Sequence, residues 1–375
     1  MIANRLERLV PIVGKKTVAR WIDAAARADH DTMITELLAA HYDPLYARSI
    51  ERNFPAIRTL SSPRCTISRP GFSDAGAHSH RQRRTGPTRR LRERARMTDY
   101  AFRIVNVFAE TPLAGNPLAV FEDARGLDAE TMQALALQFN LSETTFVLPS
   151  DRATAHVRIF TPTFEMPFAG HPTLGTAHVV RAISNAGDDV TLDLKAGIIP
   201  VHADGDVWTL TANAPKHRPP AASRAELAAM LGLDAGDLAP APPLWVDTGS
   251  EQLVIPLASF DAVRRAAPRA EALGVHGSNG ARAMAYVFAR DEDHVLARFF
   301  FKKHEAVIED PGTGSACANL GGWLLATHAA LPQRLTIDQG EAVGRPCRLG
   351  LAVTQEQHIR VSGRVIELGR GVISL

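Results

Sequence analysis

The chain has 375 residues, of which 45% are hydrophobic and 22% charged, a composition typical of a globular protein with room for two or three domains. Its formal net charge of +2 implies no nucleic-acid or membrane partner, and no apolar run reaches the roughly 18 residues that a membrane span needs. The three cysteines, Cys65, Cys317 and Cys347, form no CxxC pair, which favours a reducing cytosol and predicts a cytoplasmic protein.

The first segment, residues 1–55, is predicted to be a helical fragment, because apolar residues recur at helical spacing around Trp21 and Leu37. Within it, residues 41–49 read His-Tyr-Asp-Pro-Leu-Tyr-Ala-Arg-Ser. This piece resembles the C-terminal end of tRNA 2-selenouridine synthase. The nucleotide-binding loop and the reactive cysteine of that family have no counterpart in this chain, so its activity is not carried over.

Residues 56–96 are predicted to form a disordered, arginine-rich linker. Residues 81–96 hold eight arginines and one acid, Glu93, and such a composition cannot bury enough apolar surface to offset the entropy of ordering. A nucleic-acid-binding arm is the less favoured interpretation, because no aromatic residues interleave with the charges. Met97 then precedes a strand pattern and resembles a natural start, which suggests a gene fusion or a misplaced start codon.

From Met97 onward the pattern predicts two mixed α/β halves, each with one apolar helix. Asp128 is expected to cap a helix that carries Met132 and Phe139 on one face. Apolar helices are expected at 173–183 and 319–330. Strands are expected at 100–108, 144–148, 155–160, 198–201, 207–211, 244–246, 253–256, 283–289 and 295–301. The tail, 359–375, is expected to be short strands split by glycines.

Two similar glycine motifs lie about 140 residues apart, at 168–175 and at 309–316. Each is expected to open an apolar helix, where free backbone N–H groups and the helix dipole attract a carboxylate or phosphate. Two such sites in one chain suggest two related halves that grip one anionic substrate between them.

Four motifs follow one another in the chain. They read Gly-Asn-Pro at 115–117, Leu-Ser-Glu-Thr-Thr-Phe at 141–146, Phe-Ala-Gly-His-Pro-Thr-Leu-Gly-Thr-Ala at 168–177 and Glu-Asp-Pro-Gly-Thr-Gly-Ser-Ala at 309–316. Together they resemble the phenazine-biosynthesis isomerase family (PhzF-like proteins) over residues 97–375. The resemblance implies an α+β fold like that of diaminopimelate epimerase: two similar domains, each a mostly antiparallel sheet wrapped around a central helix. It also implies a homodimer. The proline-rich stretch 214–220 predicts a domain division into 97–214 and 215–375, in which the last strands can return to the first domain.

Glu143 is the leading candidate for an acid/base. A carboxylate at a strand start beside Leu141 and Phe146 is expected to be partly desolvated, which raises its pKa toward neutrality. A solvated or helix-capping glutamate is the structural alternative. The resemblance implies that this position is the general acid/base of the family.

Two further side chains are candidate catalytic residues. His171 sits where the first glycine turn enters its helix and is suited either to donate to a substrate oxygen or simply to pack at the turn. Asp310 precedes the second glycine motif and is suited either to contact substrate or to cap the helix dipole. The resemblance implies that both line the site and hold the substrate.

Three residues are candidate substrate-binding groups. Gly170 and Gly314 would supply backbone N–H groups, although turn glycines also serve purely conformational needs. Ser315 would donate its hydroxyl to the substrate or cap the helix.

Cysteine chemistry is disfavoured. Epimerases and racemases of this fold carry a pair of cysteines (or threonine) immediately before the glycine motifs, and those positions here are Ala169 and Pro311, which cannot take a proton. Cys317 falls inside the helix, where a buried, inert thiol is the common state. No nucleotide-binding loop or metal-ligand spacing is present in the sequence, so neither a cofactor nor a metal is predicted.

These observations predict a cofactor-independent isomerase that moves a proton between carbons of a small unsaturated or cyclic carboxylate, with one glutamate as acid and base. An amino-acid epimerase or racemase on the same fold is one alternative. A tRNA-associated binding protein, suggested by the N-terminal fragment and the arginine run, is another, although a nucleic-acid partner is not favoured. The identity of the substrate is not readable from the sequence.

Overall fold

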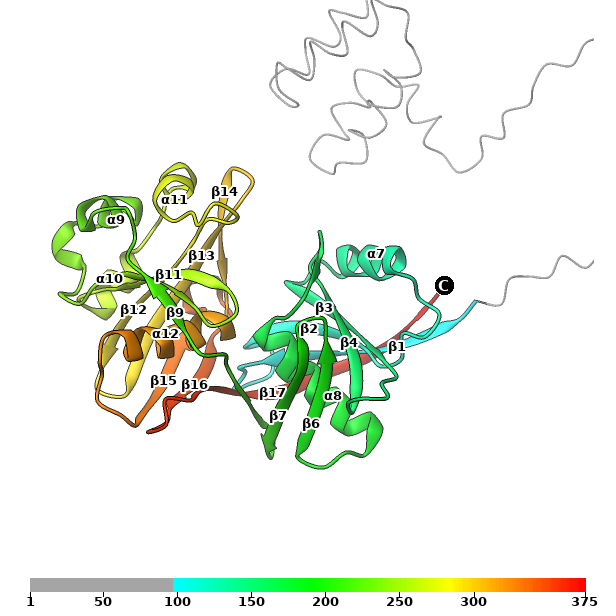
Figure 1. Ribbon diagram of the computed structural model, residues 1–375. Helices are drawn as coiled ribbons and strands as arrows, with labels where there is room; N and C mark the ends of the chain where they lie inside the picture. The colour runs from blue at the N-terminus through cyan, green and yellow to red at the C-terminus, as the bar shows by residue number, and fades with distance from the viewer. Residues whose placement is uncertain (1–96) are drawn as a thin grey trace, which may run out of the picture. The chain divides into compact units, whose positions relative to one another are not determined.

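A computed structural model describes residues 97–375 of the chain (Figure 1). The helical fragment expected at 1–55 and the linker expected at 56–96 lie outside these residues. The helices are α7 (Ala129–Phe139), α8 (Gly170–Ser184), α9 (Arg224–Met230), α10 (Phe260–Arg265), α11 (Ala270–His276) and α12 (Gly314–Ala326), with short 3-10 turns η1 (Ala235–Asp237) and η2 (Glu341–Val343).

Residues 97–375 also form seventeen strands. They are β1 (Asp99–Val107), β2 (Asn116–Phe121), β3 (Glu143–Leu148), β4 (Ala155–Phe160), β5 (Glu165–Met166), β6 (Asp189–Leu194), β7 (Gly197–Asp204), β8 (Val207–Thr211), β9 (Lys216–Arg218), β10 (Leu244–Asp247), β11 (Glu251–Pro256), β12 (Met284–Asp291), β13 (His294–Lys303), β14 (Ala306–Asp310), β15 (Gln333–Gln339), β16 (Cys347–Val353) and β17 (Ile359–Ser374).

The first group of strands closes into a ring around α8. Its hydrogen-bonded order is β1-β2-β3-β4-β6-β7-β8-β17, and β17 pairs back to β1. Inside the ring, Leu174 and Ala177 of α8 are fully buried, because all sides of the helix meet apolar strand residues. The first turn of α8 is therefore held rigidly.

The second group wraps around α12 in the order β9-β10-β11-β12-β13-β15-β16-β17, and no pairing of β9 with β17 closes it among residues 97–375. Figure 1 shows α12 among these strands. Leu320 and Cys317 of α12 are fully buried. The sheet-rich composition agrees with the predicted α+β class, while the division into two similar domains at 214/215 stays a prediction.

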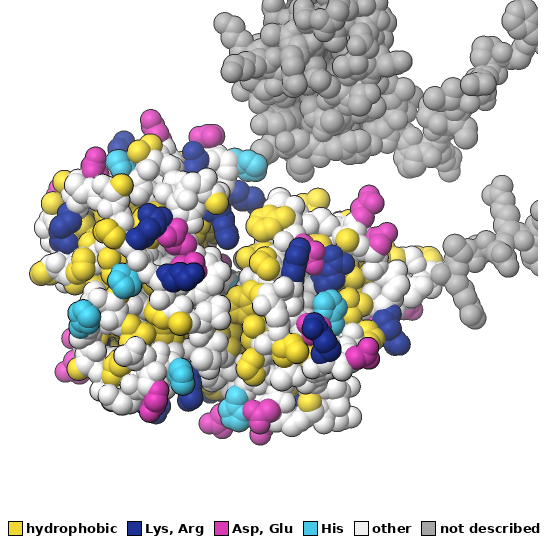
Figure 2. All heavy atoms as spheres, viewed as in Figure 1, with side chains coloured by type: hydrophobic (Ala, Val, Ile, Leu, Met, Phe, Trp, Pro, Cys, Tyr) yellow, Lys and Arg dark blue, Asp and Glu magenta, His cyan; other side chains and the backbone are white. Residues whose placement is uncertain are grey.

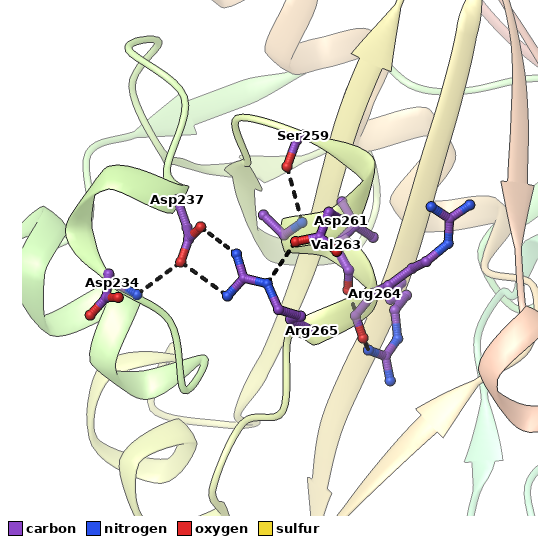
Figure 3. Close-up of polar contacts among 9 residues, drawn as sticks. Asp234, Asp237, Ser259, Asp261, Val263, Arg264 and Arg265 are labelled. Atoms are coloured by element: carbon purple, nitrogen blue, oxygen red, sulfur yellow. Dashed lines mark hydrogen bonds and ion pairs between the residues drawn. The ribbon is translucent and has the colours of Figure 1, made fainter.

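An outer layer of short helices covers the second group and is joined by charged side chains (Figure 3). Arg265 donates to Asp237 at 2.6 Å and to Asp261 at 2.8 Å, and Ser259 caps α10 by accepting from the backbone N–H of Ala262. Because Arg265 and Asp261 are well exposed, this cluster contributes little free energy and serves mainly to join η1 to α10.

The expectation of short, glycine-split strands at 359–375 is wrong, because β17 runs unbroken from Ile359 to Ser374. Two of its glycines make room for aromatic rings. A Cβ on Gly363 would lie 2.2 Å from the ring of Phe108, and a Cβ on Gly371 would lie 2.5 Å from the ring of Phe102. These glycines mark close approach to the strand and not breaks in it.

The expected apolar helices exist with shifted ends. α8 starts at Gly170, three residues earlier than expected, because Pro172 is tolerated in a first turn where its missing N–H has no role. α12 starts at Gly314 and ends at Ala326, before the expected limit at 330, since His328 adopts a left-handed backbone with φ 57°.

On the face drawn in Figure 2, basic and acidic side chains are interspersed over both groups of strands. A nucleic-acid-binding surface gathers basic residues into a stripe or patch, and this face has no such gathering. Within residues 97–375, the helices lack the length and apolar character needed to cross a membrane.

Candidate active site

The three predicted catalytic residues meet where the two groups of strands touch. Glu143 is the first residue of β3, His171 lies in the first turn of α8, and Asp310 is the last residue of β14. The Nε2 atom of His171 lies 3.4 Å from Oε2 of Glu143. Asn116 lies between His171 and Asp310. Its Nδ2 atom is 3.4 Å from Nδ1 of His171 and donates to Oδ1 of Asp310 at 3.2 Å.

The N-termini of α8 and α12 abut one another at the predicted glycines. A Cβ on Gly170 would lie 3.4 Å from the Cα of Gly314 and 3.5 Å from the backbone nitrogen of Ser315. Neither N-cap residue, Ala169 or Thr313, caps its helix with a side-chain hydrogen bond. Two uncapped helix starts add their positive ends, and an anion placed between them would be stabilised by both.

Burial controls the charges of this site. Burial, and secondarily the charge of Asp310, raise the pKa of Glu143 to about 8. Burial raises the pKa of Asp310 to about 6, against the opposing hydrogen bonds from Thr313 and Asn116. Burial lowers the pKa of His171 to about 3. At neutral pH, Glu143 therefore holds its proton in most molecules, His171 is uncharged and Asp310 carries the negative charge.

Asp310 is held by a braced turn that the sequence did not reveal. The hydroxyl of Thr313 donates to Oδ2 of Asp310, and Nε2 of Gln339 donates to the Asp310 carbonyl at 2.9 Å. The Oε1 atom of Gln339 also accepts from the backbone N–H of Thr313. Gln339 is buried at the end of β15, and a polar residue at an inward position of a strand was the only signal available.

Ser315 is prepared to act as a donor. It is the second residue of α12 and therefore not the N-cap. Its Oγ accepts from Nε2 of Gln252 at 2.9 Å, while Oε1 of Gln252 accepts from Nδ2 of Asn319 at 2.9 Å. Oδ1 of Asn319 in turn accepts from the hydroxyl of Thr248 at 2.7 Å. Because Ser315 is already an acceptor in this chain, its own proton is free to point outward.

The two cysteines in this part of the chain are buried, and burial raises the pKa of both the Cys317 and the Cys347 thiol. Ala169 and Pro311, the positions at which the epimerase alternative expects thiols, precede the two helices and carry no ionisable group. Among residues 97–375, no group of three or more His, Cys, Asp or Glu side chains is arranged to hold a metal ion.

The sequence matches the family model described as phenazine biosynthesis-like protein over residues 105–371. An uncharacterised isomerase of Pasteurella multocida is 38% identical over 288 residues, which cover 73% of this chain and 94% of that protein. A trans-2,3-dihydro-3-hydroxyanthranilate isomerase of Pseudomonas aeruginosa is 37% identical over 254 residues, which cover 66% of this chain and 87% of that protein.

Solved structures agree with these matches. A PhzF-family phenazine biosynthesis protein of Bacillus anthracis matches with a TM-score of 0.68 and 26% identity. The match covers 74% of this chain and 100% of the Bacillus chain. A probable proline racemase of Agrobacterium radiobacter matches with a TM-score of 0.51 and 10% identity. The match covers 74% of this chain and 93% of the racemase chain, and it shows similarity of fold alone.

Fold and sequence together define an isomerase of the phenazine-biosynthesis-like class. The chain belongs to the PhzC-PhzF family, and the resemblance carried by the four motifs is confirmed. The tRNA 2-selenouridine synthase resemblance of residues 1–55 lies outside both the matched range and the described residues.

Proposed function

We propose that this protein moves a proton between two carbons of a small unsaturated or cyclic carboxylate, with Glu143 as the single acid and base. The observation that carries the proposal is the buried Glu143 carboxyl, with a pKa of about 8, beside two uncapped helix N-termini. A carboxyl with a pKa near the working pH both accepts and returns a proton efficiently.

The proposed reaction has two steps. Ionised Glu143 removes a proton from a carbon next to the unsaturated system, and the electron pair of that C–H bond delocalises into the substrate. The protonated Glu143 then returns the same proton to a different carbon of that system. Backbone N–H groups near Gly170 and Gly314, with the Ser315 hydroxyl, would hold the substrate carboxylate as negative charge develops.

His171 and Asp310 are proposed to hold and orient the substrate. His171 is neutral and next to Glu143, so it can donate to a substrate oxygen without losing a charge. Asp310 is ionised at neutral pH and fixed by Thr313 and Gln339, so it can accept from a hydroxyl or amino group of the substrate.

The substrate class proposed for this protein is broader than the substrate that the names of its relatives specify. Several relatives are trans-2,3-dihydro-3-hydroxyanthranilate isomerases, which supports a ring-unsaturated amino carboxylate as the substrate class. Two similar domains, 97–214 and 215–375, and a homodimer are part of the same proposal and rest on the family resemblance.

Incubation with cyclic and unsaturated amino carboxylates in heavy water, followed by proton NMR, tests the proposal. The wild type should isomerise at least one of them. Turnover by Glu143→Gln, which keeps the shape but cannot cycle a proton, should be lower by about 10²-fold or more. Glu305→Gln is the matched control, since the Glu305 side chain is 94% exposed. Near-full turnover by a folded Glu143→Gln protein would remove Glu143 from the mechanism.

A further inference from the structure

Asn116 occupies a position between the two groups of strands to which the motifs assign no role. It is the first residue of β2 and is completely buried. Its Nδ2 atom is surrounded by the Gly312 carbonyl at 3.0 Å, Oδ1 of Asp310 at 3.2 Å and Nδ1 of His171 at 3.4 Å. One amide thus contacts both sides of the candidate active site.

The chemistry of these neighbours fixes the orientation of the amide. A carbonyl oxygen and an ionised carboxylate only accept hydrogen bonds, so the –NH₂ group of Asn116 must face them. The reversed orientation would press Oδ1 of Asn116 against two oxygen acceptors and leave both without a donor. The nitrogen that faces Nδ1 of His171 is therefore a donor.

We propose that Asn116 is a positioning residue that holds neutral His171 as its Nε2–H tautomer, which leaves that N–H without a protein partner on the side of the ring next to Glu143. A neutral imidazole carries one proton on one of its two nitrogens. Since Nδ1 faces a donor, it must be the acceptor, and the proton then sits on Nε2, which lies 3.4 Å from Oε2 of Glu143.

The opposite tautomer would have one unfavourable contact in every state and a second one when Glu143 is ionised. Its Nδ1–H would face the Asn116 –NH₂, donor against donor, and its Nε2 lone pair would face Glu143. That lone pair repels an ionised carboxylate, so the wrong tautomer disfavours the form of Glu143 that removes a proton. The tautomer itself follows from geometry alone, while its effect on turnover rests on the proposed function.

The backbone around Asn116 is braced, so the amide is presented at a fixed place. Nε of Arg345 donates to the Gly115 carbonyl at 2.9 Å, and the Gly115 N–H donates to the Pro346 carbonyl at 2.9 Å. Gly115 has φ +78°, and a Cβ there would lie 2.6 Å from the Val107 carbonyl oxygen. Such support is what a positioning residue requires.

The tautomer is tested without substrate, by nitrogen NMR of protein labelled with ¹⁵N-histidine. The His171 signals are assigned by their loss in His171→Asn. In the wild type they should show a neutral ring with the proton on Nε2 across pH 6–8. An Nδ1–H ring, or an averaged mixture of tautomers, overturns the proposal whether or not any substrate is turned over.

The variant Asn116→Leu removes the donor at similar size. His171 should then show a mixture of tautomers, and kcat should fall about tenfold or more while KM changes less. Asn213→Leu is the matched control, because Asn213 is an exposed asparagine between β8 and β9, and it should change neither reading. A folded Asn116→Leu protein that keeps a pure Nε2–H ring shows that another group sets the tautomer and overturns the proposal. If the variant fails to fold, the wild-type spectrum decides.

Discussion

Glu143 is a carboxyl group that is buried away from water. Its Oε2 atom has no hydrogen-bond partner among the described residues, and the carboxyl has a raised pKa because of burial and the nearby Asp310 charge. Carboxyl groups with such a raised pKa are concentrated at functional sites, where an acid or base works best when its pKa is close to the working pH.

The activity should therefore depend on pH through Glu143. Because the ionised form removes the proton, kcat/KM should rise about tenfold per pH unit below a pKa near 8 and level off above it. Rates measured from pH 6 to 9.5 at low substrate concentration check this. A flat profile over that range would mean that Glu143 is already ionised in the free enzyme.

The free energy of unfolding should also depend on pH through Glu143, but in the opposite direction to the activity. Folding raises the pKa of Glu143 from 4.5 to about 8, so the folded state binds this proton more tightly than the unfolded state does. Its contribution to stability is therefore complete below about pH 4.5 and is lost as pH rises toward about 8. The uncharged variant Glu143→Gln should gain on the wild type over that window, by on the order of a few kcal/mol.

Urea unfolding of both proteins at pH 5, 7 and 9 measures this difference. Ionisable groups that do not interact with Glu143 cancel in the comparison, so the change of the stability difference with pH reports Glu143 and the neighbouring Asp310. A difference that stays constant from pH 5 to 9 would contradict a raised pKa.

The sequence motifs predicted the candidate catalytic residues but not the side chains that hold them in place. Glu143, His171 and Asp310 lie in motifs that could be read directly. Asn116 contacts Asp310 across 194 positions, and Gln252 contacts Ser315 across 63. Such pairs leave no periodic trace, because a buried amide fits only where two distant segments happen to meet.

The packing of α8 inside its ring depends on the absence of a side chain at Gly175. A Cβ there would lie 2.7 Å from Cδ2 of Leu118 and 2.9 Å from Cγ2 of Val107. Although alanine gains up to about 1 kcal/mol of helix propensity, overpacking should dominate, and Gly175→Ala should lower the free energy of unfolding by about 1–3 kcal/mol.

Chemical denaturation of Gly175→Ala against Gly187→Ala tests this. A Cβ at Gly187 meets no atom within 4 Å, so that substitution reports backbone effects without a clash. Equal stability of the two variants would show that the ring widens around α8 at no cost.

Helix and strand patterns succeeded where burial and periodicity agree, as in α7, whose N-cap is Asp128 as expected. They failed at β17, since glycine has two opposite meanings in a strand. Gly363 and Gly371 read as breaks in sequence, yet each accommodates an aromatic ring from another segment. Only the position of Phe108 and Phe102 in space separates the two meanings.

For the whole protein, the family match predicts that residues 97–375 suffice. The family model matches residues 105–371, and the alignment with the Pasteurella relative covers 94% of that protein. A chain that begins at Met97 should keep the melting temperature and the turnover of the full chain, because a complete relative corresponds to it. Calorimetry and activity assays of both chains compare them directly. A melting temperature lower by several degrees would mean that residues 1–96 contribute to the folded state.

The long strand β17 also sets the order of events during synthesis. The ring around α8 stays open between β8 and β1 until Ile359–Ser374 has left the ribosome, since β17 fills that gap. About 150 residues separate β8 from β17, which at ~5–20 residues per second leaves the gap open for roughly 7–30 s. During that time the nascent chain presents two unpaired strand edges and one bare flank of α8, which are surfaces that chaperones bind and that neighbouring chains on a polysome can invade.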